Sequence, residues 1–152
     1  MKYLIAPFCA AVVVCAAACL PAVAQGKPAA PRTLKVNLNY TGAGPVDNEH
    51  RIFVFLFDRP EFVHAGPVEP VARLAGISKD AVVTFPDTGM SPVYVGTAYD
   101  PAGRYSGQSG PPPPGASLGM YSRRCGVPAA VKIAPGKVSE IRLTFDDTSQ
   151  MP

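Results

Sequence analysis

The chain has 152 residues, with 14 basic and 11 acidic side chains and a formal net charge of +3. This charge is small and its basic residues are scattered, with Arg123-Arg124 as the one adjacent pair, so we expect no nucleic-acid partner. The length suits one domain with its own hydrophobic core and is too short for two ordinary domains.

The first two dozen residues predict an export signal. Lys2 gives a positive start, the stretch from Leu4 to Leu20 is apolar and uncharged, and Ala22-Val23-Ala24 places small residues at the cleavage positions. Residues 1–24 are therefore interpreted as a signal peptide that is cleaved after Ala24, which leaves a periplasmic or extracellular protein with no membrane span. In an alternative interpretation, Ala16-Ala17-Ala18-Cys19 is a lipobox, and Cys19 is lipidated and anchors the chain.

Three of the four cysteines fall inside this predicted signal, at positions 9, 15 and 19. The mature chain then keeps Cys125 alone, so it has no internal disulfide. The thiol of Cys125 is free, buried or paired with another chain, and the protein is expected to be a monomer or a Cys125-linked dimer.

A short Pro-rich segment, residues 25–32, predicts a flexible leader before a domain that spans residues 33–146. Residues 33–40 alternate apolar and polar side chains, which predicts a half-buried strand. Residues 52–57 are apolar on both faces. This pattern predicts a central strand covered on each side, or one whose second face lies under a loop.

Further strands are predicted at residues 71–74 (an edge strand), 81–85, 93–99, 130–134 and 138–145. In the last of these, Ile141, Leu143 and Phe145 face the core. Residues 100–128 show no periodicity and contain the run Pro111–Pro114, so they predict a long Gly/Pro-rich loop. Residues 147–152 predict a polar tail, in which Asp147 and the preceding Asp146 serve solubility.

These elements predict an all-β fold. Six to eight short strands, seven being the expected number, are separated by Gly- and Pro-containing turns, and no amphipathic helix exceeds two turns. We therefore expect an antiparallel Greek-key β-sandwich of the immunoglobulin or transthyretin-like kind.

Three segments carry a resemblance to known proteins. They are Val54-Phe55-Leu56-Phe57-Asp58, Tyr94-Val95-Gly96-Thr97-Ala98-Tyr99-Asp100, and Pro135-Gly136-Lys137 followed by Ile141-Arg142-Leu143. Their order resembles exported bacterial β-sandwiches of the transthyretin-like, carboxypeptidase-regulatory-like kind, and in particular a family of unassigned function. The resemblance covers residues 34–146 and implies an accessory module, although a shared fold does not carry function.

The loop that follows Asp100 departs from this family's pattern. In the family it often resembles a calcium loop, rich in acidic and amide side chains. Here Pro101, Ala102 and Arg104 replace the oxygen-bearing residues, and calcium needs six to eight oxygen ligands. The sequence therefore predicts no metal and no other cofactor.

His50, His64 and Cys125 are the other candidates for metal binding or catalysis. His50 and His64 lie on opposite sides of the 52–57 strand, too far apart for a shared metal, and we interpret them as solvated loop histidines. Arg123-Arg124 would lower the pKa of the Cys125 thiol, but no base stands in a recognisable motif with it. The protein is therefore predicted not to be an enzyme.

The leading functional hypothesis is a non-enzymatic binding or structural module that contacts an unidentified protein or glycan of the cell envelope. Its predicted contact surface is the 100–128 loop, with Tyr99, Asp100, Arg104, Tyr105, Tyr121, Arg123 and Arg124 as contact residues and Cys125 as an intermolecular or reactive thiol. One alternative is a domain that binds carbohydrate or a small ligand through Tyr40, Tyr94, Tyr99 and Tyr105. The other is an enzyme or redox thiol centred on Cys125. Deletion of residues 107–119 is expected to leave the fold stable.

Overall fold

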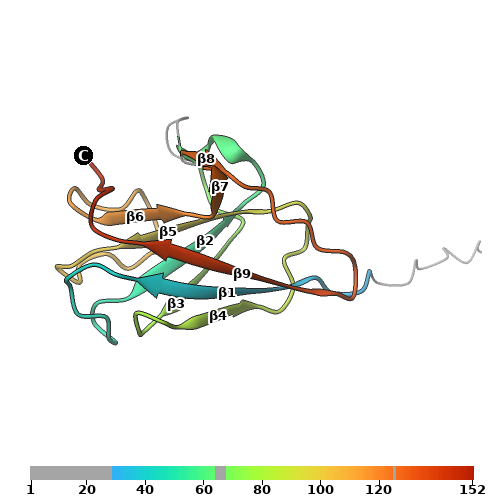
Figure 1. Cartoon of the computed structure of the whole chain (residues 1–152), viewed down its shortest axis with the longest axis horizontal. Coiled ribbons are helices and arrows are strands. Elements are labelled where there is room, and N and C mark those ends of the chain that lie inside the picture. The colour runs from blue at the N-terminus through green and yellow to red at the C-terminus, as the bar shows by residue number, and fades with distance from the viewer. Residues whose placement is uncertain (1–28, 64–67, 125) are drawn as a thin grey trace, which may run out of the picture.

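The computed structural model describes residues 29–63, 68–124 and 126–152. Within these ranges nine strands and one short 3₁₀ helix form two facing sheets and a small hairpin (Figure 1). No helix in the described ranges has the length and apolar character needed to cross a membrane. The predicted signal peptide, Cys19, His64 and Cys125 lie outside these residues.

The first sheet has the strand order β4-β1-β9. It consists of β1 (Thr33–Tyr40), β4 (Val82–Phe85) and β9 (Val138–Phe145). β1 runs antiparallel to β4 but parallel to β9, in a register that pairs Thr33 with Val138 and Tyr40 with Phe145. The expectation of a wholly antiparallel sandwich is therefore wrong for this pair. Side-chain alternation specifies which face of a strand is buried but not the direction of its neighbour.

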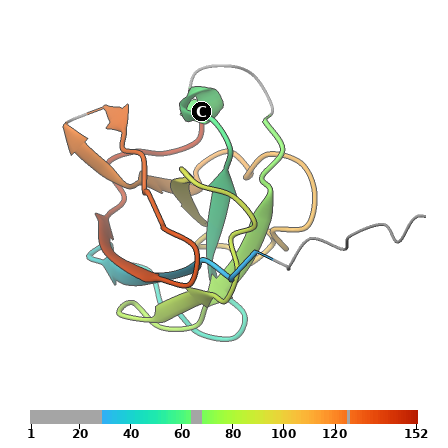
Figure 2. The ribbon, with the colours of Figure 1, turned by 90° about the vertical axis from the view of Figure 1, so that its right-hand side faces the viewer.

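The second sheet has the strand order β3-β2-β5-β6, and all its neighbours are antiparallel. Its strands are β3 (Ala72–Gly76), β2 (Ile52–Phe57), β5 (Tyr94–Tyr99) and β6 (Ser117–Met120). A 3₁₀ helix, η1 (Pro60–Val63), follows β2. The hairpin of β7 (Ser122–Arg124) and β8 (Val127–Pro128) projects from the corner of the two layers, as the end-on view shows (Figure 2).

The core lies between the two sheets and confirms the predicted alternation. Leu34, Val36 and Leu38 of β1 are buried there with Ile141, Leu143 and Phe145 of β9. The central strand β2 is buried on both faces, as predicted. Its even-numbered residues join the core, and Phe53, Phe55 and Phe57 form a second apolar cluster on the outer face of the second sheet. The β-sandwich class is confirmed.

Two predicted segments differ from the structure. Residues 130–134 form no strand, because Val131 bridges Val93 alone, yet Val131 and Ile133 are buried as their alternation indicates. Residues 100–128 are not one loop, since they contain β6, β7 and β8. Deletion of residues 107–119 would remove most of β6, so the structure argues against the expectation that the fold tolerates this deletion.

Candidate functional site

The predicted contact loop divides into two structurally different parts. Residues 100–116, here named the coat loop, pack through Tyr105 on the aromatic outer face of the second sheet. Residues 117–128 continue as β6 and the β7–β8 hairpin. The first part covers a face of the sheet, and the second part carries the basic pair Arg123-Arg124.

The coat loop is held at its start by Asp100. One carboxylate oxygen of Asp100, Oδ1, accepts a hydrogen bond from the Ala102 amide at 2.9 Å, and Oδ2 accepts from the amides of Arg104 and Tyr105 at 2.9 and 3.1 Å. Asp100 is 4% exposed. A carboxylate engaged by three amides fixes the loop geometry, so Asp100 serves the loop and is not a surface contact.

Aromatic packing holds the middle of the coat loop. The Tyr105 ring meets the edge of Phe53 with centroids 5.3 Å apart. The Arg73 guanidinium on β3 donates to the carbonyl oxygens of Gly107, at 2.8 Å, and Gln108. Gly107 has a φ of +70°, and a Cβ there would lie 2.3 Å from a ring carbon of Phe53, so this position requires glycine.

Two of the predicted contact residues are interior. Tyr99 is fully buried between the sheets, and its hydroxyl donates to the carbonyl of Pro45 at 2.5 Å. Burial raises the pKa of this hydroxyl. The prediction that Tyr99 and Asp100 contact a partner is therefore wrong, because the end of β5 lies under the 41–51 turn and the coat loop.

The aromatic face proposed for carbohydrate does not exist as one surface. Tyr40 and Tyr99 lie in the core, with ring centroids 4.7 Å apart. Tyr94 and Tyr105 belong instead to the cluster on the outer face of the second sheet. The four tyrosines occupy opposite sides of that sheet and cannot contact one ligand together.

The β7–β8 hairpin presents the predicted basic pair to solvent. Arg123 and Arg124 are exposed on β7, and Val127 of β8 is 57% exposed. The base of the hairpin is fixed, since the Tyr121 amide donates to Val95 and the Tyr121 carbonyl accepts from the Ala129 amide, both at 2.9 Å. Tyr121 also packs against the core. The two arginines therefore project from a hairpin whose base is hydrogen-bonded to β5 of the second sheet.

A polar hollow of about 380 Å³ lies beside this hairpin. The segment 130–132 borders it on one side, and residues 139–141 of β9 border it on the other, with Tyr121 and Arg123 completing the lining. The carboxylate of Glu140 accepts from Asn37 Nδ2 at 2.8 Å. Among the described residues, no ion pair neutralises Arg123 or Lys132. The hollow therefore carries a positive charge that its own acidic residue does not balance.

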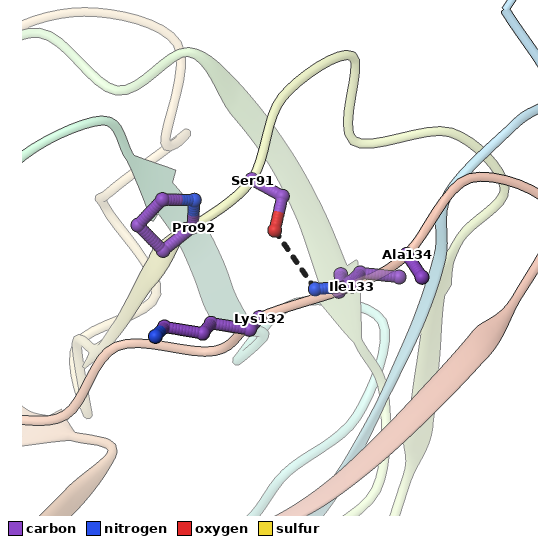
Figure 3. A pocket seen from close by; sticks show the side chains of 5 residues that line it. All are labelled: Ser91, Pro92, Lys132, Ile133 and Ala134. Carbon is purple, nitrogen blue, oxygen red and sulfur yellow. Dashed lines mark hydrogen bonds between the residues drawn. The ribbon is translucent and has the colours of Figure 1, made fainter.

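A second, more open hollow of about 510 Å³ lies next to the first one, and Lys132 lines both. Its other lining residues are Ser91, Pro92, Ile133 and Ala134 (Figure 3). The Ser91 hydroxyl accepts a hydrogen bond from the Ile133 amide at 2.8 Å. This bond and the reciprocal bonds between Val93 and Val131 fasten the 130–134 segment to the chain entering β5. We name Tyr121, Arg123, Arg124, Val127 and Lys132 the hairpin surface.

Of the two histidines and the cysteine considered for chemistry, the structure describes His50 alone. His50 lies on the 41–51 turn with its Nδ1 3.0 Å from Asp47 Oδ1. The amides of His50 and Glu49 hold the pKa of Asp47 below its ordinary value. The described residues contain no group of three His, Cys, Asp or Glu side chains placed to hold a metal. His64 and Cys125 lie outside those residues, and Arg104 is exposed on the coat loop.

One polar cluster has no counterpart in the sequence predictions. Asp147, expected in a solubilising tail, accepts from the Tyr40 hydroxyl at 2.5 Å and the Ser117 hydroxyl at 2.7 Å through Oδ1, and from the Ala43 amide at 2.9 Å through Oδ2. These bonds, that of Tyr40 first, hold the pKa of Asp147 below its ordinary value. Burial, and then Asp147, raise the pKa of Tyr40. The cluster ties β1, β6 and β9 together at one end.

Asp147→Asn is expected to destabilise the protein by about 1–3 kcal/mol at neutral pH, because a neutral amide with one acceptor oxygen cannot accept from the Tyr40 and Ser117 hydroxyls and the Ala43 amide as the charged carboxylate does. The pKa of Asp147 is lower in the folded protein than in the unfolded chain. The carboxylate therefore stabilises the fold above the unfolded pKa of about 4, and this stabilisation is lost as the pH falls through the folded pKa. Urea unfolding from pH 7 down to about pH 2 should therefore show the gap between wild type and variant narrowing. A gap independent of pH would contradict this role.

The comparisons with known proteins add no relative. No family model, no curated protein and no solved structure matches the chain. The resemblance to transthyretin-like sandwiches thus stays a prediction, and any function has to be argued from the fold and the surface alone.

Proposed function

We propose that this protein is an exported, non-enzymatic β-sandwich module that binds a component of the cell envelope through the hairpin surface. The observation that carries the proposal is the polar hollow of about 380 Å³ between the projecting hairpin and β9. Its lining carries the positive charges of Arg123 and Lys132 against the single carboxylate of Glu140. Binding residues commonly lie on segments that a rigid scaffold positions. Here the sandwich is the scaffold and the hairpin is such a segment.

The proposal narrows the contact surface that the sequence suggests. The coat loop uses its main polar and aromatic side chains internally, through Asp100, Tyr105 and the bonds from Arg73. The hairpin surface, by contrast, holds exposed arginines and an exposed apolar side chain, Val127. Arginine beside aromatic and apolar groups is the composition that protein interfaces favour.

The proposal predicts that reversing the hairpin charges abolishes partner capture. The mature chain, immobilised, is exposed to an envelope extract of its native host, and the captured components are compared between wild type and Arg123→Glu/Arg124→Glu. The matched control is Arg51→Glu/Arg104→Glu, which changes the net charge equally at exposed sites outside the hairpin and the lining of the hollow. Capture should fall at least about tenfold in the hairpin variant and persist in the control.

Two results would count against the proposal. A partner captured equally well by both variants would place the contact elsewhere, and the absence of any partner of the wild-type chain would remove the binding role. An intact mass of the native protein tests where the predicted signal peptide is cleaved. A mass for residues 25–152 supports cleavage after Ala24, whereas an acylated chain starting at Cys19 contradicts it.

A further inference from the structure

The backbone of β9 presents an open edge at the hollow. The Thr33 amide donates to Lys137 at 3.1 Å, and the Thr41 amide donates to Phe145 at 3.0 Å, so odd-numbered residues of β9 direct their carbonyls to β1. Backbone groups alternate sides along a strand, and the N–H and C=O of Glu140 consequently point away from β1. In the described part of the chain, β1 is the sheet neighbour of β9, and no strand lies beyond it.

The corresponding edge of the other sheet is covered. The Leu118 amide of β6 donates to Ser149 at 2.7 Å, and the Met151 amide donates to Ala116 at 2.8 Å. An extended segment of the chain itself therefore lies along β6. Beside β9, the 130–132 segment and residues 139–141 border the hollow, and no backbone hydrogen bond between these two segments is found in the described residues. The Ser139 hydroxyl reaches Lys132 across the hollow at 3.3 Å.

From these observations we infer that the hollow is a peptide-binding groove in which an extended acidic segment of a partner protein adds to the edge of β9. The inference rests on the proposed function and names the class of its partner. Backbone hydrogen bonds to Glu140 supply the alignment, as in other cases of strand addition to a sheet edge. Carboxylates of the added strand meet Arg123 and Lys132, which line the groove.

Charge and shape favour this occupant. Successive side chains of a strand point to opposite faces, so acidic residues at every second position would all face the cationic side of the groove. The lining holds two cationic side chains, Arg123 and Lys132, against one carboxylate, that of Glu140, which accepts a hydrogen bond from Asn37. The volume of about 380 Å³ lies within the range of ligand sites, and its lining is mostly polar, which suits a backbone better than an apolar ligand.

The first test uses a labelled, capped hexapeptide of alternating valine and glutamate, and it measures fluorescence anisotropy with the mature protein. We expect saturable binding with a Kd below about 1 mM, which weakens as salt is added. The same peptide with lysine for glutamate should not bind. A peptide methylated on alternate backbone nitrogens should bind at least about fivefold more weakly, because it loses hydrogen bonds to the edge.

Variants of the protein separate the edge from the charges. Glu140→Pro removes the outward N–H at a position where an edge strand tolerates proline, whereas Glu140→Ala keeps that N–H. The proline variant should weaken peptide binding about fivefold relative to the alanine variant. Arg123→Glu/Lys132→Glu should weaken binding at least about tenfold, and Arg51→Glu/Arg104→Glu should not. Circular dichroism of each variant confirms that it is folded.

The outcomes distinguish this inference from the broader proposal. If backbone methylation leaves the affinity of the peptide unchanged, or if citrate displaces the peptide completely, the hollow is an anion site and strand addition is overturned. Self-association of the protein in sedimentation, lost in Glu140→Pro, would make the occupant a second copy and also overturn it. If no peptide binds while the envelope partner still depends on Arg123 and Arg124, strand addition fails and the binding module stands.

Discussion

Tyr99→Ala is expected to lower the free energy of unfolding by about 3–5 kcal/mol, as for other large side chains removed from a core. The Tyr99 ring is fully buried and lies against that of Tyr40, so its removal leaves a cavity between the two sheets. The hydroxyl bond to Pro45, which fastens the 41–51 turn, is lost as well. Urea unfolding with linear extrapolation measures the change.

Tyr99→Phe is the matched control, because it keeps the ring and removes the hydroxyl. Its expected cost is about 1 kcal/mol, the value of one hydrogen bond. Equal losses for the two variants would mean that the Pro45 contact, and not core packing, accounts for the contribution of this residue.

Asp100→Ala should destabilise the protein by about 3 kcal/mol, since three amides lose a charged acceptor. The effect begins in the coat loop. Hydrogen exchange at the amides of Ala102, Arg104 and Tyr105 should accelerate by more than exchange in β1, because the loop opens before the sandwich does. These are the amides that the carboxylate engages.

Asp58→Ala serves as the control for Asp100. Asp58 is an exposed carboxylate that follows β2 in the way that Asp100 follows β5, and its side chain bonds to the neighbouring Arg59. Exposed ion pairs contribute little to stability, so this variant should unfold like wild type. If Asp100→Ala leaves loop exchange unchanged, the anchoring role of Asp100 is disproved.

The sequence predicts those strands whose own residues show an alternating or a continuous apolar pattern. Three strands have the bounds that the sequence predicts, because each shows clear alternation or a continuous apolar run between turn residues. They are Thr33–Tyr40, Ile52–Phe57 and Val138–Phe145. β6 has the sequence SLGM and lacks such a pattern, and it is a strand because it pairs with β5. Strand formation there is a tertiary effect, which local reasoning misses.

The candidate site was predictable in part. Arg123 and Arg124 lie on the surface as expected, since a basic pair in a polar segment is rarely buried. The prediction that Tyr99 and Asp100 are surface contacts fails because Tyr99 ends β5 and Asp100 follows it, and the sequence cannot show what covers the end of a strand. Asp147 was missed for the same reason. The parallel pairing brings the ends of β1 and β9 together, and a buried tyrosine there needs a polar partner.

The pairing of β1 with β9 also sets the order in which the protein can be completed. β1 is the first of the described strands to be synthesised and borders β9, the last of them, which supplies Ile141, Leu143 and Phe145 to the shared core. Contacts between residues so far apart in the sequence form late, and proteins that depend on such contacts fold slowly. During synthesis the growing chain therefore lacks a closed sandwich.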